Sequence, residues 1–245
     1  MIKKNSFAWL LCAISLASCA KHDPILPGER FDIFGSNDVS VQNRDVPQLS
    51  GTITNISGDS NCDYHQDERN TIWRGDKKVW SGFATNNPVK SNQAPRCDGR
   101  FIYTGLSTGE VVKVDANSGR QIWSTDVFRA NNLTGGASLV DIVAHVGLND
   151  KYVYAGGLGD AFCKLKSSNG DTVWCLNISV GVDFIMVDDF VFVVGTDNNL
   201  YAINKNTGGV YWRSEIKKQV APKYEKGVIV VGRQKINPKD GSMIK

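Results

Sequence analysis

Short, mainly apolar runs that end in glycine recur between residues 101 and 232. An alternating run, a polar turn that ends in glycine, and a third run follow each of them. Runs of this length, bounded by turn residues, predict β-strands. No segment shows a sustained helical period. The four runs span residues 101–105, 152–156, 190–195 and 228–232.

The polar turns place glycine and tryptophan at fixed positions. The turn glycines are 51, 38 and 33 residues apart, and a Trp lies four residues after three of them. A period near 40 with strands joined by tight turns is typical of β-propeller blades. Glycine supplies the positive φ of such turns, and the Trp is expected to fill the wedge between neighbouring blades. The repeated residues are Gly119, Trp123, Gly170, Trp174, Gly208, Trp212 and Gly241.

The pattern predicts an all-β fold, a β-propeller of four-stranded blades, in residues 71–245. At 40 to 45 residues a blade, this stretch has room for about four blades. Residues 20–70 are rich in Asn, Asp, Ser and Gly and poor in large apolar groups. That composition predicts a flexible tether with one short strand at residues 51–56.

The N-terminus has the pattern of a targeting segment. Lys3 and Lys4 precede an apolar run at residues 7–16, which is too short to span a bilayer. The run leads into Leu-Ala-Ser-Cys at residues 16–19, which resembles the bacterial lipobox. The resemblance implies that residues 1–18 are a signal peptide, and that Cys19 is acylated and anchors the chain to the periplasmic face of the outer membrane. Disulfides can form in that compartment.

Two of the repeat units narrow the class of propeller. Residues 112–123 and 200–212 resemble the repeat of quinoprotein-type propellers. Together with Cys19, Leu-Pro-Gly-Glu-Arg at residues 26–30 and Val-Trp-Ser-Gly at residues 79–82, they resemble the BamB-type outer-membrane assembly lipoproteins, in their alphaproteobacterial form. The resemblance implies a scaffold without cofactor or catalytic centre, which docks the periplasmic repeats of BamA. It also implies eight blades, so this chain is expected to be shortened.

The family resemblance points to one candidate partner contact. Family members dock through a segment with two acidic residues that leads into a blade. Asp141 matches the first acid, whereas Val143 replaces the second. Because the repeats allow a shift of one blade in register, the matching place can also fall near Asp183.

Other classes of function fit the sequence less well. Lys3 and Lys4, two of the 28 basic residues, lie in the predicted signal peptide. The other 26 basic residues nearly balance the 25 acidic ones, so the chain lacks the excess of positive charge that is typical of a nucleic-acid binder. Cys62, His65 and Cys97 could imitate half of a zinc site, but no second ligand pair completes it. A quinone-dependent dehydrogenase-like enzyme and a generic ligand-binding propeller of the cell envelope remain as alternatives.

The hairpin register predicts a disulfide. If the turn is centred on Asn169, Cys163 lies directly opposite Cys175, at a Cα distance that a disulfide tolerates. Cys62 and Cys97 are then the remaining pair.

A partial ring would leave a strand edge and an apolar face uncovered, and self-association of two copies is one way to complete it.

Overall fold

The computed structural model describes residues 39–41, 46–56, 62–86, 94–128, 139–149 and 151–244. All of these belong to one compact unit, residues 36–245. The predicted signal segment, Cys19 and residues 26–30 lie outside the described residues. Within the described ranges, the regular structure is all β-strand, and no helix is long and apolar enough to cross a membrane.

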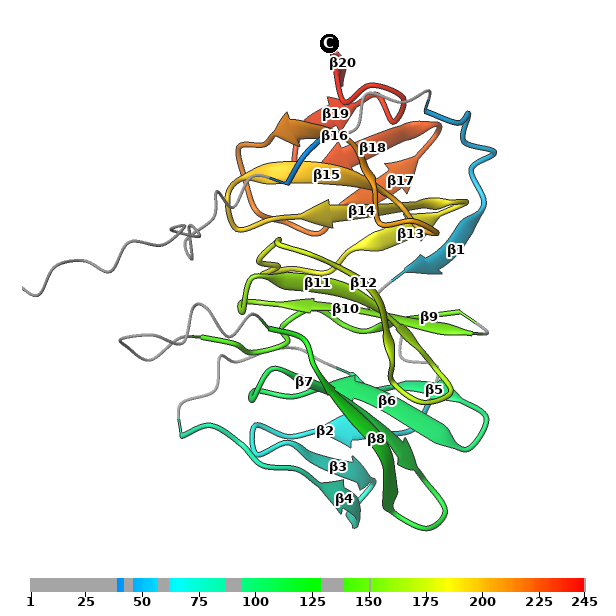
Figure 1. Ribbon diagram of the computed structural model, residues 1–245, viewed down its shortest axis with the longest axis vertical. Coiled ribbons are helices and arrows are strands. Elements are labelled where there is room, and N and C mark those ends of the chain that lie inside the picture. The colour runs from blue at the N-terminus through cyan, green and yellow to red at the C-terminus, as the bar shows by residue number, and fades with distance from the viewer. Residues whose placement is uncertain are drawn as a thin grey trace, which may run out of the picture. The chain divides into compact units, whose positions relative to one another are not determined.

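The strands form five antiparallel sheets that follow one another along the chain (Figure 1). The first has β2 (His65–Gln66), β3 (Thr71–Arg74) and β4 (Lys77–Ser81), and the second has β5 (Arg96–Asp98), β6 (Phe101–Gly105), β7 (Glu110–Asp115) and β8 (Arg120–Asp126). The third has β9 (Gly147–Leu148), β10 (Tyr152–Gly157), β11 (Ala161–Lys166) and β12 (Thr172–Leu176). The fourth has β13 (Ile185–Val187), β14 (Phe190–Val194), β15 (Asn199–Asn204) and β16 (Val210–Glu215). The fifth has β17 (Lys223–Glu225), β18 (Val228–Val231), β19 (Gln234–Ile236) and β20 (Met243–Ile244).

A strand from the N-terminal stretch is added to the fourth sheet. β1 (Ile53–Ile56) pairs antiparallel with β13, where the sequence predicted a short strand. The carboxylate of Asp188 holds its start, because Ser50 Oγ donates to it at 2.6 Å and the Gly51 amide at 2.9 Å. β2 also comes from the stretch expected to be a tether, so the propeller sheets begin before residue 71.

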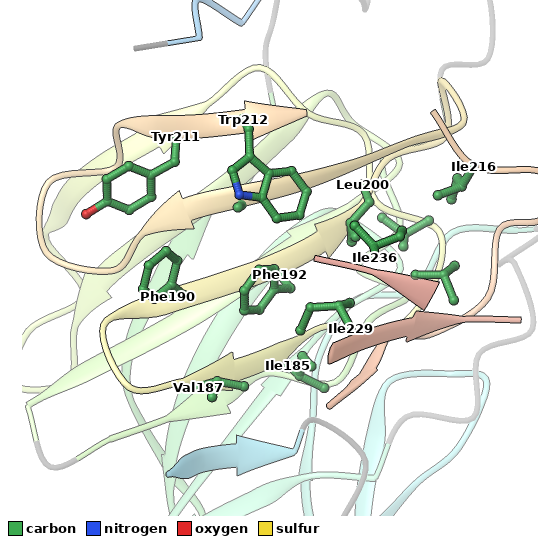
Figure 2. Packing of buried hydrophobic residues seen from close by; sticks show 13 residues of the cluster. Ile185, Val187, Phe190, Phe192, Leu200, Tyr211, Trp212, Ile216, Ile229 and Ile236 are labelled. Atoms are coloured by element: carbon green, nitrogen blue, oxygen red, sulfur yellow. The ribbon is translucent and has the colours of Figure 1, made fainter. Parts of the chain in front are cut away.

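Apolar side chains fill the space between each pair of consecutive sheets. Between the fourth and fifth sheets, Phe190 and Phe192 stack with ring centroids 5.7 Å apart, and Trp212 packs on Phe192. Ile229 and Ile236 of the fifth sheet complete this cluster (Figure 2). Three similar clusters join the preceding sheets. Since each sheet buries both faces only by stacking, the prediction of an all-β fold built from propeller blades is confirmed.

The turn glycines pack directly on the tryptophans of the preceding sheet. Gly170 has φ +79°, and a Cβ atom on it would lie 2.9 Å from the Trp123 ring. The same atom on Gly208 would lie 2.8 Å from Trp174, and on Gly241 2.6 Å from Trp212. Glycine is therefore required at these turns twice, for its positive φ and for the close approach of the neighbouring ring.

Two buried lysines cap the same turns. Lys113 Nζ donates to the Ser167 carbonyl of the next sheet at 2.9 Å, and it lies 4.1 Å from the centroid of the Phe101 ring. Lys164 Nζ donates to the Lys205 carbonyl at 3.0 Å in the following interface. Burial lowers the pKa of both ammonium groups. The aromatic face and the carbonyl oxygen offset part of the cost of desolvating each charge.

The register across β11 and β12 places Cys163 directly opposite Cys175. Their Cα atoms are 4.1 Å apart and a disulfide joins them; a second disulfide joins Cys62 and Cys97, whose Cα atoms are 5.7 Å apart.

We predict that Cys163 and Cys175 are oxidised in the native protein isolated without reductant. Because the pair is 12 residues apart, the disulfide should stabilise the fold by about 2–3 kcal/mol. Unreduced peptide mapping by mass spectrometry should yield the linked Cys163–Cys175 peptide, and the double variant Cys163→Ala/Cys175→Ala should unfold at lower denaturant. Two alkylatable thiols at these positions in the native protein would refute this prediction.

Candidate docking surface

The topology gathers two kinds of loop at one end of the sheets. In a four-stranded meander, the turn between the second and third strands and the connection to the next sheet lie at the same end. We call this the interblade end. It comprises the turns at residues 106–109, 158–160, 195–198 and 232–233 and the described parts of the connections at 82–95, 127–146, 177–184 and 216–222.

Large apolar side chains are exposed on these connections. Phe83 is 86% exposed, Leu139 is 53% exposed, and Val220 is also exposed. Isolated exposed aliphatic residues are ordinary on protein surfaces, but a nearly fully exposed aromatic ring is a typical anchor for a binding partner. Phe83 is therefore the strongest candidate contact at this end.

The backbone around Phe83 is held in place by a buried asparagine. Asn70 is 2% exposed and has φ +57°. Its side-chain amide donates to the Phe83 carbonyl and to Ser107 Oγ, while its oxygen accepts from the Ser107 amide at 3.2 Å. Ser107 Oγ in turn accepts from the Thr85 amide at 3.2 Å. The loop thus presents the Phe83 ring to solvent from a fixed backbone, which lowers the entropy cost of binding.

A polar cleft lies at the same end, between the third and fourth sheets. Its volume is about 130 Å³. Ser179 Oγ donates to Asp160 at 2.5 Å, and the Tyr201 hydroxyl donates to Asp197. Burial, and next the Asp197 carboxylate, raise the pKa of Tyr201. With two carboxylates, the cleft suits a cationic or N–H donor group of a partner. The lining residues are Asp160, Asn177, Ile178, Ser179, Thr196, Asp197 and Tyr201.

The two connections around the third sheet are joined by hydrogen-bonding contacts between His145 and Asp183. His145 and Asp183 lie 38 residues apart, two residues before the first strand of their respective sheets. The His145 amide donates to Asp183 Oδ1 at 2.8 Å, and His145 Nδ1 lies 2.8 Å from the same oxygen. Asp183, the alternative partner contact from the sequence, therefore has a structural role between neighbouring connections.

Asp141 lies at the interblade end, but its burial does not favour direct contact with a partner. It is 3% exposed, and its carbonyl accepts from the Leu158 amide at 2.9 Å. A Cβ atom on Gly157 would lie 2.3 Å from that carbonyl oxygen. These contacts fasten the connection to the turn at residues 158–160, so the geometry supports a positioning role for Asp141.

The structure brings together the repeat residues, each of the last three turn glycines with the tryptophan of the preceding sheet. Cys62 is bonded to Cys97, which removes both from the zinc half-site considered above. In the described part of the chain, no group of three or more His, Cys, Asp or Glu side chains could hold a metal. Asn70 and Phe83 were missed from the sequence, where the available signal was one aromatic residue in the polar stretch at residues 81–87.

The stacked sheets of three to five strands and their Trp–glycine contacts define a protein of the β-propeller class with quinoprotein-like repeats. The fold resembles the crystal structure of BamB from Moraxella catarrhalis with a TM-score of 0.61. That match has 20% sequence identity and covers 74% of this chain and 61% of the other.

The chain belongs to the family described as "Outer membrane protein assembly factor BamB", whose sequence profile matches residues 36–214 and 164–244. Among curated proteins, the BamB of Francisella tularensis is 27% identical over 62% of this chain and 34% of its own length. The BamB of Yersinia pestis is 24% identical over 63% of this chain and 42% of its own. The chain thus spans roughly two fifths or less of these relatives. The expectation of a family of assembly factors rather than enzymes is confirmed.

We predict that Asn70→Ala loosens the loop that carries Phe83. The substitution removes the four hydrogen bonds that the Asn70 side chain makes with Gln66, Phe83 and Ser107 and places alanine at a positive φ, so it should cost about 2–4 kcal/mol. Amide hydrogen exchange should accelerate in residues 82–86 more than in β10 or β14. Unchanged exchange in residues 82–86 would show that Asn70 does not hold this loop.

Proposed function

We propose that this chain is a non-catalytic scaffold lipoprotein of the outer-membrane β-barrel assembly machinery. The observation that carries the proposal is the family match over residues 36–214 and 164–244, together with relatives named as outer membrane protein assembly factors. The proposed partner is the periplasmic region of a BamA-like barrel-assembly protein. A dehydrogenase-like function is not favoured, because the relatives are named as assembly factors.

The interblade end is the proposed docking surface for that partner. Phe83 supplies an exposed aromatic ring on a fixed loop. The cleft supplies the carboxylates of Asp160 and Asp197, to which a basic side chain of the partner can bind. Aromatic side chains that become buried on binding supply much of the binding energy of protein interfaces. Asp141 and Asp183 contribute by holding the connections in place.

A lipid anchor at Cys19 would bring this surface close to the membrane. We propose that acylated Cys19 holds the chain on the periplasmic face of the outer membrane. More than one acyl chain gives stable attachment, whereas a single chain gives reversible binding.

We predict that Phe83→Ala weakens capture of the BamA-like protein without lowering the stability of the fold. Loss of an anchoring ring costs about 2 kcal/mol, so recovery at limiting concentration should fall more than tenfold. The experiment is affinity purification of the tagged chain from solubilised membranes, with quantification of BamA. Val173→Ala is the matched control, because Val173 is 41% exposed but lies on β12, away from the interblade end. Equal recovery by the two variants would count against this surface.

We predict that Cys19→Ser abolishes acylation, since the lipid is attached through the Cys19 thiol. The variant should fail to incorporate radiolabelled palmitate and should leave the outer-membrane fraction. Incorporation at the level of the unmodified chain would disprove anchoring at Cys19, while the docking proposal could still be tested by the capture experiment.

A further inference from the structure

The contact between the first and second sheets differs from the three contacts that follow it. Its buried side chains are all aliphatic, whereas each of the other three clusters contains buried aromatic rings. A Cβ atom on Gly119 would lie 2.5 Å from the Val79 carbonyl oxygen, with no tryptophan atom within 4 Å. The first contact therefore lacks the turn–tryptophan packing of the later ones. The buried residues of its cluster are Ile72, Ile102, Leu106, Val112 and Val114.

Two polar side chains of the first sheet bond to the second sheet. Gln66 Oε1 accepts from Thr104 Oγ1. Asn70 donates to Ser107 Oγ at 3.0 Å and also to the Phe83 carbonyl. Because Asn70 joins the Phe83 backbone to the second sheet in this way, the loop that presents Phe83 is fixed only while the two sheets stay together.

A disulfide closes the chain around this contact. Cys62 lies three residues before β2, and it is bonded to Cys97 of β5 in the second sheet. The two cysteines are 35 positions apart, and the chain between them contains β2, β3, β4 and Phe83. Cys97 also packs against the aliphatic cluster. The Cys163–Cys175 disulfide, by contrast, joins two strands within the third sheet.

The Cys62–Cys97 bridge stabilises the contact by restricting the separated form. When the first sheet leaves the second, a bridged chain has far fewer conformations than an unbridged one, so separation is less favourable. For a loop of this length, the bridge should lower the separated population by about 100- to 1,000-fold. Since buried aromatic rings are missing from this cluster, the contact depends on the disulfide more than the later contacts do.

We propose that the Cys62–Cys97 disulfide is a redox switch for the Phe83 loop. Both cysteines are half-buried, so a dithiol reductant can reach the bridge. One thiolate of the dithiol attacks a bridge sulfur, forms a mixed disulfide and displaces the other cysteine, which takes up a proton. The second thiolate displaces the remaining cysteine, so the dithiol becomes a disulfide and two electrons pass to the protein. The first sheet then separates from the second, and the backbone that presents Phe83 loses its fixed position.

Amide hydrogen exchange on the full chain tests the structural part of this proposal. Cys62→Ser/Cys97→Ser should accelerate exchange in β3 and in residues 82–86 by about 100-fold relative to β14. Cys163→Ser/Cys175→Ser is the matched control, because it removes a disulfide that lies within one sheet and should leave the ratio of exchange in β3 and β14 unchanged. No acceleration in the first variant, or equal acceleration in both, would overturn the proposal.

Reduction of the unmodified chain gives a readout that does not require either variant to fold. Dithiothreitol is added in steps, and each sample is alkylated and mapped by mass spectrometry. Faster exchange in β3 should appear together with loss of the Cys62–Cys97 linked peptide, and reoxidation should restore slow exchange. Slow exchange in β3 after complete reduction of this bridge would overturn the switch.

The consequence for docking rests on the proposed function, and capture of the BamA-like protein separates the two. A partner that binds only the closed form has its affinity lowered by the fraction of chains in that form, so Cys62→Ser/Cys97→Ser should lower capture about fivefold or more. Loss of capture by Phe83→Ala but not by the cysteine variant would overturn the switch and leave the docking surface in place. Faster exchange in the cysteine variant with full capture by both would support the structural switch and overturn docking through Phe83.

Discussion

The packing of a turn glycine on the tryptophan of the preceding sheet is the contact on which the rest of the structure depends. A single four-stranded sheet leaves both faces exposed, and it gains stability only when a neighbour covers each face. The Trp123–Gly170, Trp174–Gly208 and Trp212–Gly241 contacts fix both the distance and the rotation between consecutive sheets. A side chain at any of these glycines would force the neighbouring ring away, and the aromatic clusters behind it would lose their close packing.

The arrangement of the docking surface follows from this stacking. Once the sheets are aligned, every connection between them emerges at the interblade end, and contacts such as His145–Asp183 form between equivalent positions one repeat apart. The same alignment brings Asn70 of the first sheet within hydrogen-bonding distance of Ser107 in the second. The exposed Phe83 ring and the carboxylate cleft are therefore presented by a framework whose geometry is set elsewhere, in the strands and turns at the opposite end.

Local sequence signals were enough to predict the strands, the tight turns and the Cys163–Cys175 register, because these depend on residues fewer than about 15 positions apart. The number of sheets was harder to predict from the sequence. The first sheet has only short strands of mixed polarity, so its β2 was assigned to the tether. Lys113 and Lys164 were missed because an isolated lysine in a strand normally indicates a solvent-facing position. Their burial depends on a carbonyl more than 40 residues away. Asn70 was missed because its burial depends on a contact with Ser107, 37 residues away in the second sheet.

The most direct test of the account compares two Gly→Ala substitutions with similar backbone conformations. Gly170 has φ +79° and lies against Trp123, whereas Gly227 has φ +85° and nothing within 4 Å of its Cβ position. Both variants carry the backbone penalty of about 1 kcal/mol, but only Gly170→Ala also disrupts sheet packing, which should cost about 1–3 kcal/mol more. Chemical denaturation should show Gly170→Ala to be clearly the less stable of the two. Equal free energies of unfolding would contradict the claim that the turn–tryptophan contact holds the sheets together.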